Sequence, residues 1–580
     1  MSNSKMDPEI IKKAEKWLKG QFDEETKARV RYMIENEPTE LVECFYKDLE
    51  FGTGGLRGVM GTGSNRMNKY TVGMATQGLS NYLKEMFPEV KPIRVAIAYD
   101  SRNNSDHFAR ITAEVFSANG FEVFLFDSLR PTPELSFAIR HLKCQSGVVI
   151  TASHNPKEYN GYKAYWDDGA QMINPHDVNV IEEVKKTESI DEVNFAGDDS
   201  KIHIIGEDID RLYLQEIKKQ SLSPDIIKKH KDLVIVYTPL HGTGYKLIPE
   251  AMEMYGFTNV HTVEEQAITD GDFPTVKSPN PEETAAMEMA LKKGKQLKAD
   301  LIMATDPDAD RVGIAVKNPK GDFVLLNGNQ TAALLIYYML GKWESNEKLS
   351  GREYIVKTIV TSEILADIAR DFKVEYFDVL TGFKFIADKI REHEGEMKYI
   401  VGGEESYGYM IGDFVRDKDA VSACAMLAET TAWAAEKGKT LYEVLIEIYL
   451  RYGFYKERLL SVVRKGKAGE AKIKQMMEDF RDHPPVEING SKVIIVKDYL
   501  KQTESDLINS IEKEIDLPKS NVLQFFTEDG TKISMRPSGT EPKIKFYFSV
   551  NEELNDAEEY EKINDKLEKR IDQVIEDLGI

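Results

Sequence analysis

Short apolar runs alternate with longer amphipathic stretches along most of the chain, and each run ends in a polar loop. In the first third, the apolar and β-branched runs cover residues 93–99, 122–126 and 147–150. Such runs are typical of strands buried on both faces of a sheet, and their alternation with helical stretches indicates an α/β domain. We therefore predict an α/β domain within residues 1–205, with ligand loops at the carboxyl ends of its strands.

A charged helical segment is predicted at the start of this domain, up to about residue 50. Asp7 followed by Pro8 is typical of a helix start. The aspartate side chain can accept from free backbone N–H groups, and proline suits the first helical position. We expect this segment to pack against the domain and to take no part in chemistry.

The same alternation returns twice, which predicts a second α/β domain over residues 206–322 and a third over residues 323–455. The expected strands are residues 233–237, 259–263 and 301–304 in the second domain, and residues 354–359, 374–376 and 399–401 in the third. Each of the three similar units therefore delivers a polar loop at a strand end.

After residue 455 the pattern changes to short strands separated by turns, with Asp529-Gly530 as a hairpin turn. The strands expected there are residues 493–496, 522–526, 532–536 and 543–550. Residues 456–580 are thus predicted to form an α+β domain, the most mobile of the four. The whole prediction is an α/β fold: three similar mixed- or parallel-sheet domains and a C-terminal α+β domain around a central cleft.

Length and composition agree with four domains of an ordinary globular protein. The chain has 580 residues, which is too long for a single hydrophobic core. Of these residues, 41% are hydrophobic and 30% are charged, as in an ordinary globular protein. Its net charge of -22 opposes a general role on nucleic acid or an anionic membrane, both of which demand a wide cationic surface. A phosphate ligand would need only a local basic pocket.

The cysteines and the N-terminus bear on the compartment. Cys44, Cys144 and Cys424 lie in separate regions without the spacing of a disulfide framework or a zinc site. The N-terminal residues are polar, and no apolar stretch reaches the roughly 18 residues of a membrane span. We expect no signal peptide, no membrane span and a cytoplasmic location.

Two loops carry the most specific chemistry. Ser153 directly follows one predicted buried strand, and Asp306, Asp308 and Asp310 follow another. A serine hydroxyl is a candidate nucleophile, and alternate carboxylates on one tight loop can converge on a hard cation such as Mg²⁺. Either motif alone is also compatible with a turn or a helix cap, but together they indicate phosphoryl transfer.

Three further loops carry weaker signals. The segment from Arg536 to Pro542 supplies a guanidinium group, two hydroxyls and a glycine, the parts of a phosphate cradle, and Lys545 adds a cation nearby. Glu404 and Ser406 could exchange hydrogen bonds with sugar hydroxyls, and residues 381–384 occupy a similar strand end. Each of these segments could equally be a plain turn.

The segment from Phe51 to Gly58 is rich in glycine. It has neither the Gly-x-Gly-x-x-Gly spacing before a helix nor the Lys-Ser/Thr of a P-loop. We do not interpret it as a nucleotide site.

From about residue 40 to the end, the chain resembles the α-D-phosphohexomutase family, the phosphoglucomutases and phosphomannomutases. Five motifs carry the resemblance in order: Gly55 to Gly58, Thr151 to Pro156 with Asn160 to Lys163, Asp306 to Arg311, Gly403 to Ser406, and Arg536 to Pro542. Five ordered motifs in one chain make a chance match negligible.

The resemblance implies a role for each motif. Ser153 would carry the phosphoryl group, and one Mg²⁺ per active site would be bound by Ser153, Asp306, Asp308 and Asp310. Around the transferring group would lie Arg57, His154, Lys163 and Arg311. The sugar would contact Thr381, Gly382, Lys384, Glu404, Ser406 and Lys418. The distal phosphate would rest on Arg536, Ser538, Gly539, Thr540 and Lys545.

The implied reaction moves phosphate between the first and sixth carbons of a sugar through a bisphosphorylated intermediate, with a sugar bisphosphate as activator. A base must take the proton of the attacking sugar hydroxyl. Lys163 is our candidate if its pKa falls beside Arg57 and the cation, and His154 is the alternative. Lys163 could equally be a cation that only holds phosphate.

The loop after Ser406 departs from part of the family. Some members carry Gly-His there, whereas this chain has Tyr407-Gly408, which weakens a dual glucose/mannose assignment. The chain looks most like the phosphoglucomutase branch that includes phosphopentomutase-active members. Interconversion of glucose 1-phosphate and glucose 6-phosphate is therefore expected first, with a phosphopentomutase or phosphomannomutase activity as the alternative.

Three other classes of protein are alternatives to this expectation. A catalytically inactive scaffold paralogue usually loses the serine or an aspartate, and all are present here. A serine hydrolase would lack its Gly-x-Ser-x-Gly elbow and leave the aspartates unexplained. A bisphosphate synthase fed by another phosphoryl donor stays open. The expected partner is a phosphorylated sugar, not nucleic acid or membrane, and the expected state is a monomer or weak homodimer.

Overall fold

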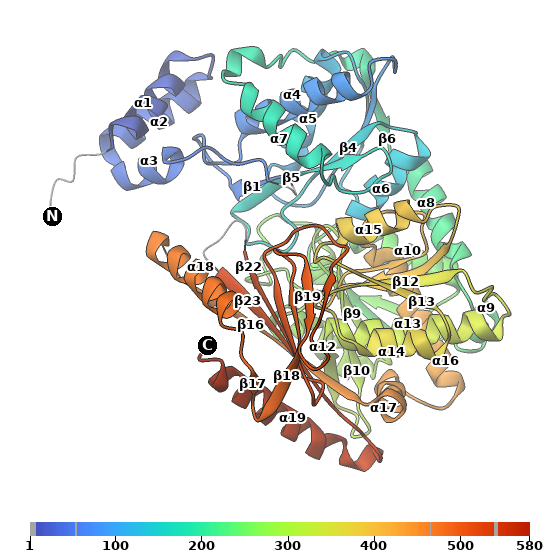
Figure 1. The fold of residues 1–580 in the computed structure, drawn as a ribbon. Coiled ribbons are helices and arrows are strands. Elements are labelled where there is room, and N and C mark those ends of the chain that lie inside the picture. Colours follow the sequence, from blue (N-terminus) through green and yellow to red (C-terminus); the bar gives the residue numbers. More distant parts are fainter. Residues whose placement is uncertain (1–6, 53–54, 465, 539–542) are drawn as a thin grey trace.

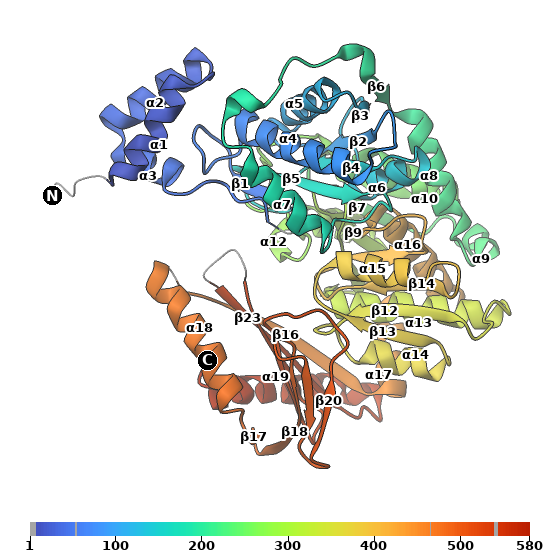
Figure 2. The ribbon, with the colours of Figure 1, turned by 45° about the horizontal axis from the view of Figure 1, so that its top comes forward.

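The computed structural model describes residues 7–52, 55–464, 466–538 and 543–580. Four sheets follow one another along the chain, three of them in α/β units and the last one antiparallel (Figure 1). In Figure 2 the units lie along an arc, from the first sheet at the top through the third at the right to the fourth at the bottom. The predicted fold class is confirmed.

The first sheet has the strand order β1-β5-β4-β2-β3-β6. Its strands are β1 (Leu56–Val59), β2 (Arg94–Tyr99), β3 (Glu122–Phe126), β4 (Ser146–Ile150), β5 (Tyr159–Trp166) and β6 (Ile202–Ile205). Strands β4, β2, β3 and β6 are parallel, while β5 is antiparallel to both of its neighbours, β4 and β1. Helices α4 (Lys69–Met86), α5 (Ser105–Ala118) and α7 (His176–Lys186) cover one face and α6 (Thr132–His141) the other.

The second sheet has the order β11-β10-β9-β7-β8. Its strands are β7 (Ile235–Thr238), β8 (Val260–Thr262), β9 (Leu301–Thr305), β10 (Val312–Lys317) and β11 (Phe323–Leu326). Strand β7 is parallel to both β8 and β9, and β10 is antiparallel to β9 and β11. The helices of this region are α8 (Glu207–Lys219), α9 (Pro224–Lys229), α10 (Gly244–Tyr255), α11 (Glu264–Ala267) and α12 (Thr284–Leu297).

The third sheet has the order β13-β12-β14-β15. Its strands are β12 (Glu353–Thr358), β13 (Glu375–Val379), β14 (Lys398–Gly403) and β15 (Tyr409–Ile411). Its helices are α13 (Gly328–Ser345), α14 (Ile364–Asp371), α15 (Phe383–Glu392), α16 (Ala420–Glu436) and α17 (Leu441–Tyr452). Helix α16 is buried over almost its whole length and lies in a hydrophobic core that the units share. The units are therefore packed against one another.

The fourth sheet has the order β16-β23-β22-β21-β18-β19-β20, with β17 paired to β18, and its pairs are antiparallel as predicted. Its strands are β16 (Phe454–Val463), β17 (Glu487–Ile488), β18 (Ser491–Asp498), β19 (Thr503–Asp506), β20 (Ile511–Glu514), β21 (Leu523–Thr527), β22 (Lys532–Pro537) and β23 (Lys543–Glu552). The fourth unit also contains helices α18 (Gly466–Asp482) and α19 (Tyr560–Asp577). Gly530, at φ +82°, makes the predicted turn between β21 and β22.

The N-terminal segment forms helices α1 (Pro8–Lys19), α2 (Glu24–Asn36) and α3 (Pro38–Phe45). Asp7 caps α1 as predicted, since its carboxylate accepts from the N–H of Glu9 at 3.0 Å. Trp17 packs against Phe22 and, edge on, against Tyr70 of α4, with ring centroids 4.4 and 5.7 Å apart. The segment is therefore fastened to the first α/β unit by aromatic contacts.

Three strands that directly follow a polar loop were missed by the sequence reading. Strands β5, β10 and β15 each return antiparallel to the strand before the loop, namely β4, β9 and β14. Each of these loops is therefore a connection held at both ends by paired strands, and its side chains stay at one edge of the sheet.

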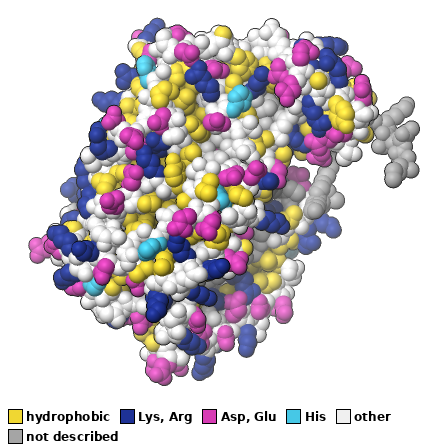
Figure 3. All heavy atoms as spheres, turned by 180° about the vertical axis from the view of Figure 1, so that it is seen from behind, with side chains coloured by type: hydrophobic (Ala, Val, Ile, Leu, Met, Phe, Trp, Pro, Cys, Tyr) yellow, Lys and Arg dark blue, Asp and Glu magenta, His cyan; other side chains and the backbone are white. Residues whose placement is uncertain are grey.

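Three further features concern membrane helices, surface charge and the cysteines. Among the described residues, no helix combines the length and apolar character that crossing a bilayer demands. On the face in Figure 3, acidic and basic side chains are interspersed. Cys44, Cys144 and Cys424 are free and buried.

Candidate active site

Ser153 lies in the loop between β4 and β5 and contacts the loop between β9 and β10. Its hydroxyl donates a hydrogen bond to Asp306 Oδ2 at 2.8 Å. The two residues belong to different sheets and are 153 positions apart in the chain. The Ser153 backbone is left-handed, at φ +52°, and its N–H donates to the Thr151 hydroxyl at 2.8 Å. A side chain that is only 4% exposed is thus turned toward the aspartates.

Arg102, which was not predicted as a site residue, holds the Ser153 loop through hydrogen bonds. Its guanidinium donates to the backbone carbonyls of Ser153, Asn155, Pro156 and Tyr159, at 2.5, 2.5, 2.9 and 3.1 Å. It is 3% exposed and lies 3.4 Å from the Asp100 carboxylate. The Asp-Ser-Arg sequence directly after β2 was the available signal, because a buried arginine needs several acceptors.

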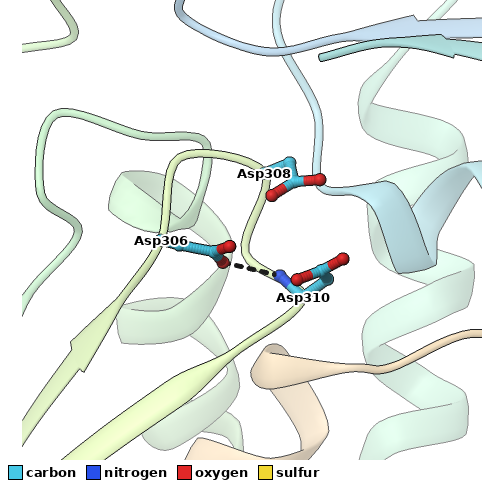
Figure 4. Close-up of side chains that lie close together, drawn as sticks. All are labelled: Asp306, Asp308 and Asp310. Carbon is cyan, nitrogen blue, oxygen red and sulfur yellow. Dashed lines mark hydrogen bonds between the residues drawn. The ribbon is translucent and has the colours of Figure 1, made fainter. Parts of the chain in front are cut away.

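Asp306, Asp308 and Asp310 converge on one point (Figure 4). All three are buried, and one carboxylate oxygen from each lies within 4.8 Å of the others. Asp306 Oδ1 accepts the N–H groups of Asp310 and Arg311, each at 3.1 Å, which fixes the loop. In the described part of the chain, Asp308 Oδ1 and Asp310 Oδ1 are buried and accept no hydrogen bond. Buried, free carboxylate oxygens at this spacing suit a hard divalent cation.

The aspartates differ in charge preference. Burial and the neighbouring carboxylates raise the pKa of Asp306 well above its ordinary value. Burial also disfavours the ionised form of Asp310, but Lys418 and Lys163 outweigh it and hold the pKa of Asp310 below its ordinary value. The cluster therefore carries negative charge that two lysines partly balance.

Lys163 and Lys418 both contact the aspartate loop. Lys163, on β5, lies 2.8 Å from Asp308 Oδ2, and Lys418 lies 3.1 Å from both Asp310 Oδ2 and Asp417 Oδ1. Burial alone would lower the pKa of each lysine, but the carboxylates reverse the effect and raise it. The predicted base role of Lys163 depends on a fall of its pKa beside Arg57 and a cation. With the aspartates as the nearest charges, the pKa of Lys163 is raised instead.

Three other predicted residues lie around this centre. Arg57, on β1, donates to Asn155 Oδ1 at 3.1 Å, and Arg311 donates to Glu282 at 2.9 Å. His154 lies 3.2 Å from the Ser153 hydroxyl through Nδ1. Burial, followed by Arg311 and Arg57, lowers the pKa of His154 well below its ordinary value, so the ring is neutral.

The loop between β14 and β15 carries Glu404, Glu405 and Ser406. Glu404 Oε1 accepts the N–H of Gly382 at 2.9 Å, which joins the two predicted sugar loops. Among the described residues, the buried Thr381 hydroxyl has no hydrogen-bond partner. Glu405 accepts from Thr358 and Thr361, each at 3.3 Å.

Lys384 and Lys418 each make a contact in this region that the sequence analysis did not predict. Lys384 forms an ion pair of 3.2 Å with Asp177 on α7, so it links the third unit to the first. A Cβ atom built on Gly408 would lie 2.1 Å from Cδ of Lys418. The lysine stem therefore occupies the space that a side chain at this position, such as histidine, would need.

The β22–β23 hairpin carries the predicted phosphate-binding residues. Arg536 and Lys545 are register partners across the two strands, and the N–H of Ser538 donates to the carbonyl of Lys543 at 2.8 Å. Gly539 and Thr540 lie outside the described residues. Burial, with help from Lys543, lowers the pKa of Lys545, while Glu405 opposes the change. The hairpin and the Glu405 loop are thus close enough to interact electrostatically.

Comparison with known proteins places these loops in a family context. Three domain profiles described as phosphoglucomutase/phosphomannomutase alpha/beta/alpha domains I, II and III match residues 48–191, 211–321 and 327–452. A phosphoglucomutase of Staphylococcus haemolyticus is 38% identical over 511 residues, covering 87% of this chain and 91% of its own. A phosphoglucomutase of Staphylococcus aureus strain MRSA252 is 39% identical over 540 residues, covering 92% and 95%.

A solved structure has a related fold. It is the open form of the exocytosis-sensitive phosphoprotein pp63/parafusin, a phosphoglucomutase from Paramecium. It superposes with a TM-score of 0.67 at 19% identity and covers 92% of this chain and 96% of its own.

Proposed function

The chain belongs to the phosphoglucomutase/phosphomannomutase family and is a phosphohexomutase of the isomerase class, and we propose that it interconverts glucose 1-phosphate and glucose 6-phosphate. The choice of glucose rests on relatives named phosphoglucomutase at 38% and 39% identity over most of the chain. The side chain of Lys418 occupies the space above Gly408. This packing supports a sugar site that differs from the site of family members with histidine at this position.

The observation that carries the proposal is the 2.8 Å hydrogen bond from the Ser153 hydroxyl to Asp306. It puts a candidate nucleophile against a buried carboxylate cluster, which is the arrangement that phosphoryl exchange needs. A serine hydrolase would leave the three converging aspartates without a role.

Asp306, Asp308 and Asp310, with an oxygen on Ser153, would hold one Mg²⁺. The fit rests on the buried carboxylate oxygens that accept no hydrogen bond within the described residues. When bound, the cation would neutralise negative charge on the transferring phosphoryl group. It would also offset the carboxylate charges that raise the pKa of Lys163.

The chain's own residues would carry out an exchange in two steps. In the first, a free hydroxyl of the sugar monophosphate attacks the phosphorus on Ser153. A P–O bond forms to the sugar, the P–O bond to Ser153 breaks, the sugar hydroxyl proton passes to a base, and the departing Ser153 oxygen takes up a proton in exchange. The product is a sugar bisphosphate, which turns over in the site. In the second step the Ser153 hydroxyl attacks the other phosphate and gives its proton to the base. The P–O bond from that phosphate to the sugar breaks, the departing sugar oxygen takes up a proton, and the isomeric monophosphate is released.

Lys163 or His154 would serve as the base. Lys163 is buried among the aspartates, and its pKa must fall when their charge is neutralised for it to act. His154 is neutral and lies 3.2 Å from the Ser153 hydroxyl, so it is placed to accept the serine's proton. Arg57 and Arg311 would balance the phosphoryl charge from either side.

We propose that the sugar and the distal phosphate are held by the third and fourth units, across a shared cleft. Glu404, Ser406 and the Thr381 hydroxyl, which has no partner among the described residues, would contact sugar hydroxyls, with Gly382, Lys384 and Lys418 beside them. Arg536 and Lys545, neighbours across the hairpin, would pair with the distal phosphate, together with Ser538, Gly539 and Thr540.

Initial rates on glucose 1-phosphate, mannose 1-phosphate and ribose 1-phosphate would test the proposal, each with Mg²⁺ and a trace of the matching bisphosphate. Fast, EDTA-sensitive conversion of glucose 1-phosphate is expected. A strong preference for ribose 1-phosphate would keep the mechanism and change the substrate. No conversion of any of the three would overturn the proposed function.

A further inference from the structure

The loop at the end of β7 contains an arrangement that the proposed chemistry does not use. Leu240 and His241 are both in the left-handed region, at φ +46° and +64°. Two consecutive non-glycine residues in this conformation are costly and persist only where the surroundings enforce them. The contacts of His241 and of the glycine after it show what enforces them here.

On one side, this loop supports the aspartate loop. The N–H of Thr243 donates to the carbonyl of Pro307 at 2.8 Å. A Cβ atom built on Gly242 would lie 2.4 Å from Cα of Pro307, so the two backbones touch. Pro307 lies between Asp306 and Asp308, and the β7 loop therefore sets the position of the proposed metal ligands.

On the other side, His241 anchors a second loop. Its two ring nitrogens make hydrogen bonds to the Ile268 carbonyl at 2.7 Å and the Thr275 hydroxyl at 2.8 Å. Those two residues bracket a turn that carries Phe273, which is itself left-handed at φ +47° and only 2% exposed. His241 thereby fixes both ends of a turn that presents one buried aromatic ring.

The ring of Phe273 reaches into the first unit and packs on Arg102. The guanidinium carbon of Arg102 lies 5.1 Å from the ring centroid, within the range of a cation–π contact. A Cβ atom on Gly271 of the same turn would lie 2.3 Å from the backbone nitrogen of Asn103. Arg102 is the residue that holds the Ser153 loop through four carbonyls.

We propose that residues 238–243 and 266–275 form an interdomain brace, and that Phe273 is a positioning residue that aligns the Ser153 loop with the aspartate loop. The proposal rests on the proposed function and deepens it. The brace links both loops to the end of β7. The aspartate loop is linked through Pro307, and the Ser153 loop is linked through Phe273 and Arg102. The effect of Phe273 on Ser153 passes through Arg102.

The test compares Phe273→Leu with a matched control. Phe257, in the same unit, is also 2% exposed and packs in the main core, so Phe257→Leu makes the same chemical change away from the brace. Phe273→Leu is expected to lower kcat roughly tenfold or more while the KM for glucose 1-phosphate stays within about twofold, since displacement of a reacting group costs rate and not binding. Phe273→Tyr, which keeps the ring, should restore kcat.

Hydrogen exchange supplies a readout besides activity. Amides of residues 153–159 should exchange faster in Phe273→Leu than in the native protein, and at the native rate in Phe257→Leu. Unchanged exchange with unchanged kcat in Phe273→Leu would overturn the brace, as would an equal loss of kcat in both leucine variants. If Phe273→Leu does not fold, Phe273→Met removes the ring at similar volume and faces the same outcomes.

The two measurements separate the brace from the proposed function. If the native protein converted no sugar phosphate while exchange at residues 153–159 still responded only to the Phe273 substitution, the function would be wrong and the brace correct.

Discussion

The Ser153 loop and the Arg536 hairpin both connect neighbouring antiparallel strands, but they are held in different ways. The Ser153 loop is tied across a domain boundary by the Asp306 hydrogen bond and by the four bonds from Arg102. The sheet that carries Arg536 contacts the third unit through side chains of β21 and β22. Examples are Gln524 Nε2 to the Ile359 carbonyl at 2.7 Å and Lys532 to Glu363 at 2.5 Å.

The difference matches the demands of the two tasks. Group transfer requires the reacting atoms to be placed to within a fraction of an ångström, and the buried ties to Ser153 supply that accuracy. Recognition of a distal phosphate requires charge and tolerates more freedom, especially if the bisphosphate must be held in two orientations. Four substitutions test this division, from the largest expected effect to the smallest.

Ser153→Ala should reduce turnover of glucose 1-phosphate by at least about three orders of magnitude, because it removes the atom that would accept the phosphoryl group. The measurement is the initial rate, with intact-mass analysis for the added phosphate in the native protein. Ser345→Ala, at an exposed serine, is the control and should be unaffected. Activity above this limit in Ser153→Ala would remove the serine from the mechanism.

Asp308→Asn should lower kcat by roughly a hundredfold and raise the Mg²⁺ concentration for half-maximal activity, since it removes one charged ligand. A Mg²⁺ titration after EDTA treatment measures both quantities. Asp322→Asn, on the turn after β10, keeps the same chemistry away from the cluster and should titrate like the native protein. Identical titration curves for all three proteins would exclude the aspartates as ligands.

Arg536→Ala should raise the KM for glucose 1-phosphate by about tenfold to a hundredfold with a smaller change in kcat, because the lost ion pair holds the distal phosphate in ground and transition states alike. Steady-state kinetics over a wide substrate range separate the two constants. Lys513→Ala, on exposed strand β20, is the control. A loss of kcat at constant KM would place Arg536 with the reacting groups and end the division drawn above.

Glu457 concerns the contact between the third and fourth units. It lies on β16, and burial raises its pKa to about 7, although Ser362 and Lys532 oppose the shift. A carboxyl whose pKa is raised by folding favours the folded state at low pH, and this contribution is lost as pH rises from its unfolded pKa through about 7.

Glu457→Gln should therefore melt close to the native protein at pH 4.5 and above it at pH 8, by an amount equivalent to about 1–2 kcal/mol after solvent screening. Thermal melts of both proteins at several pH values measure the difference, and the exposed Glu512→Gln is the control. A difference in Tm that does not change with pH would show that Glu457 does not titrate in this range.

Much of the site was predictable because its chemistry is local in the sequence. Ser153 and the three aspartates follow apolar runs, and a strand end fixes where the next residues lie. The strands β5, β10 and β15 were missed because they start directly at the polar loops. The apolar run within Val312–Lys317 was nevertheless visible as a signal.

Other features follow from contacts between residues far apart in the chain. The placement of Lys418 against Asp310 and of Lys384 against Asp177 depends on how whole units pack, and so does the raised pKa of Lys163. No local pattern encodes these distances, because each is the sum of many packing choices along the intervening chain.

By itself the sequence determined the class of fold, the nucleophile candidate and the carboxylate cluster, because periodicity and short motifs act over a few residues. Only the tertiary structure decided that Arg102 would hold the Ser153 loop and that Phe273 would cover it from another unit. A buried guanidinium must find its acceptors wherever packing brings them, and that requirement is met in space and not along the chain.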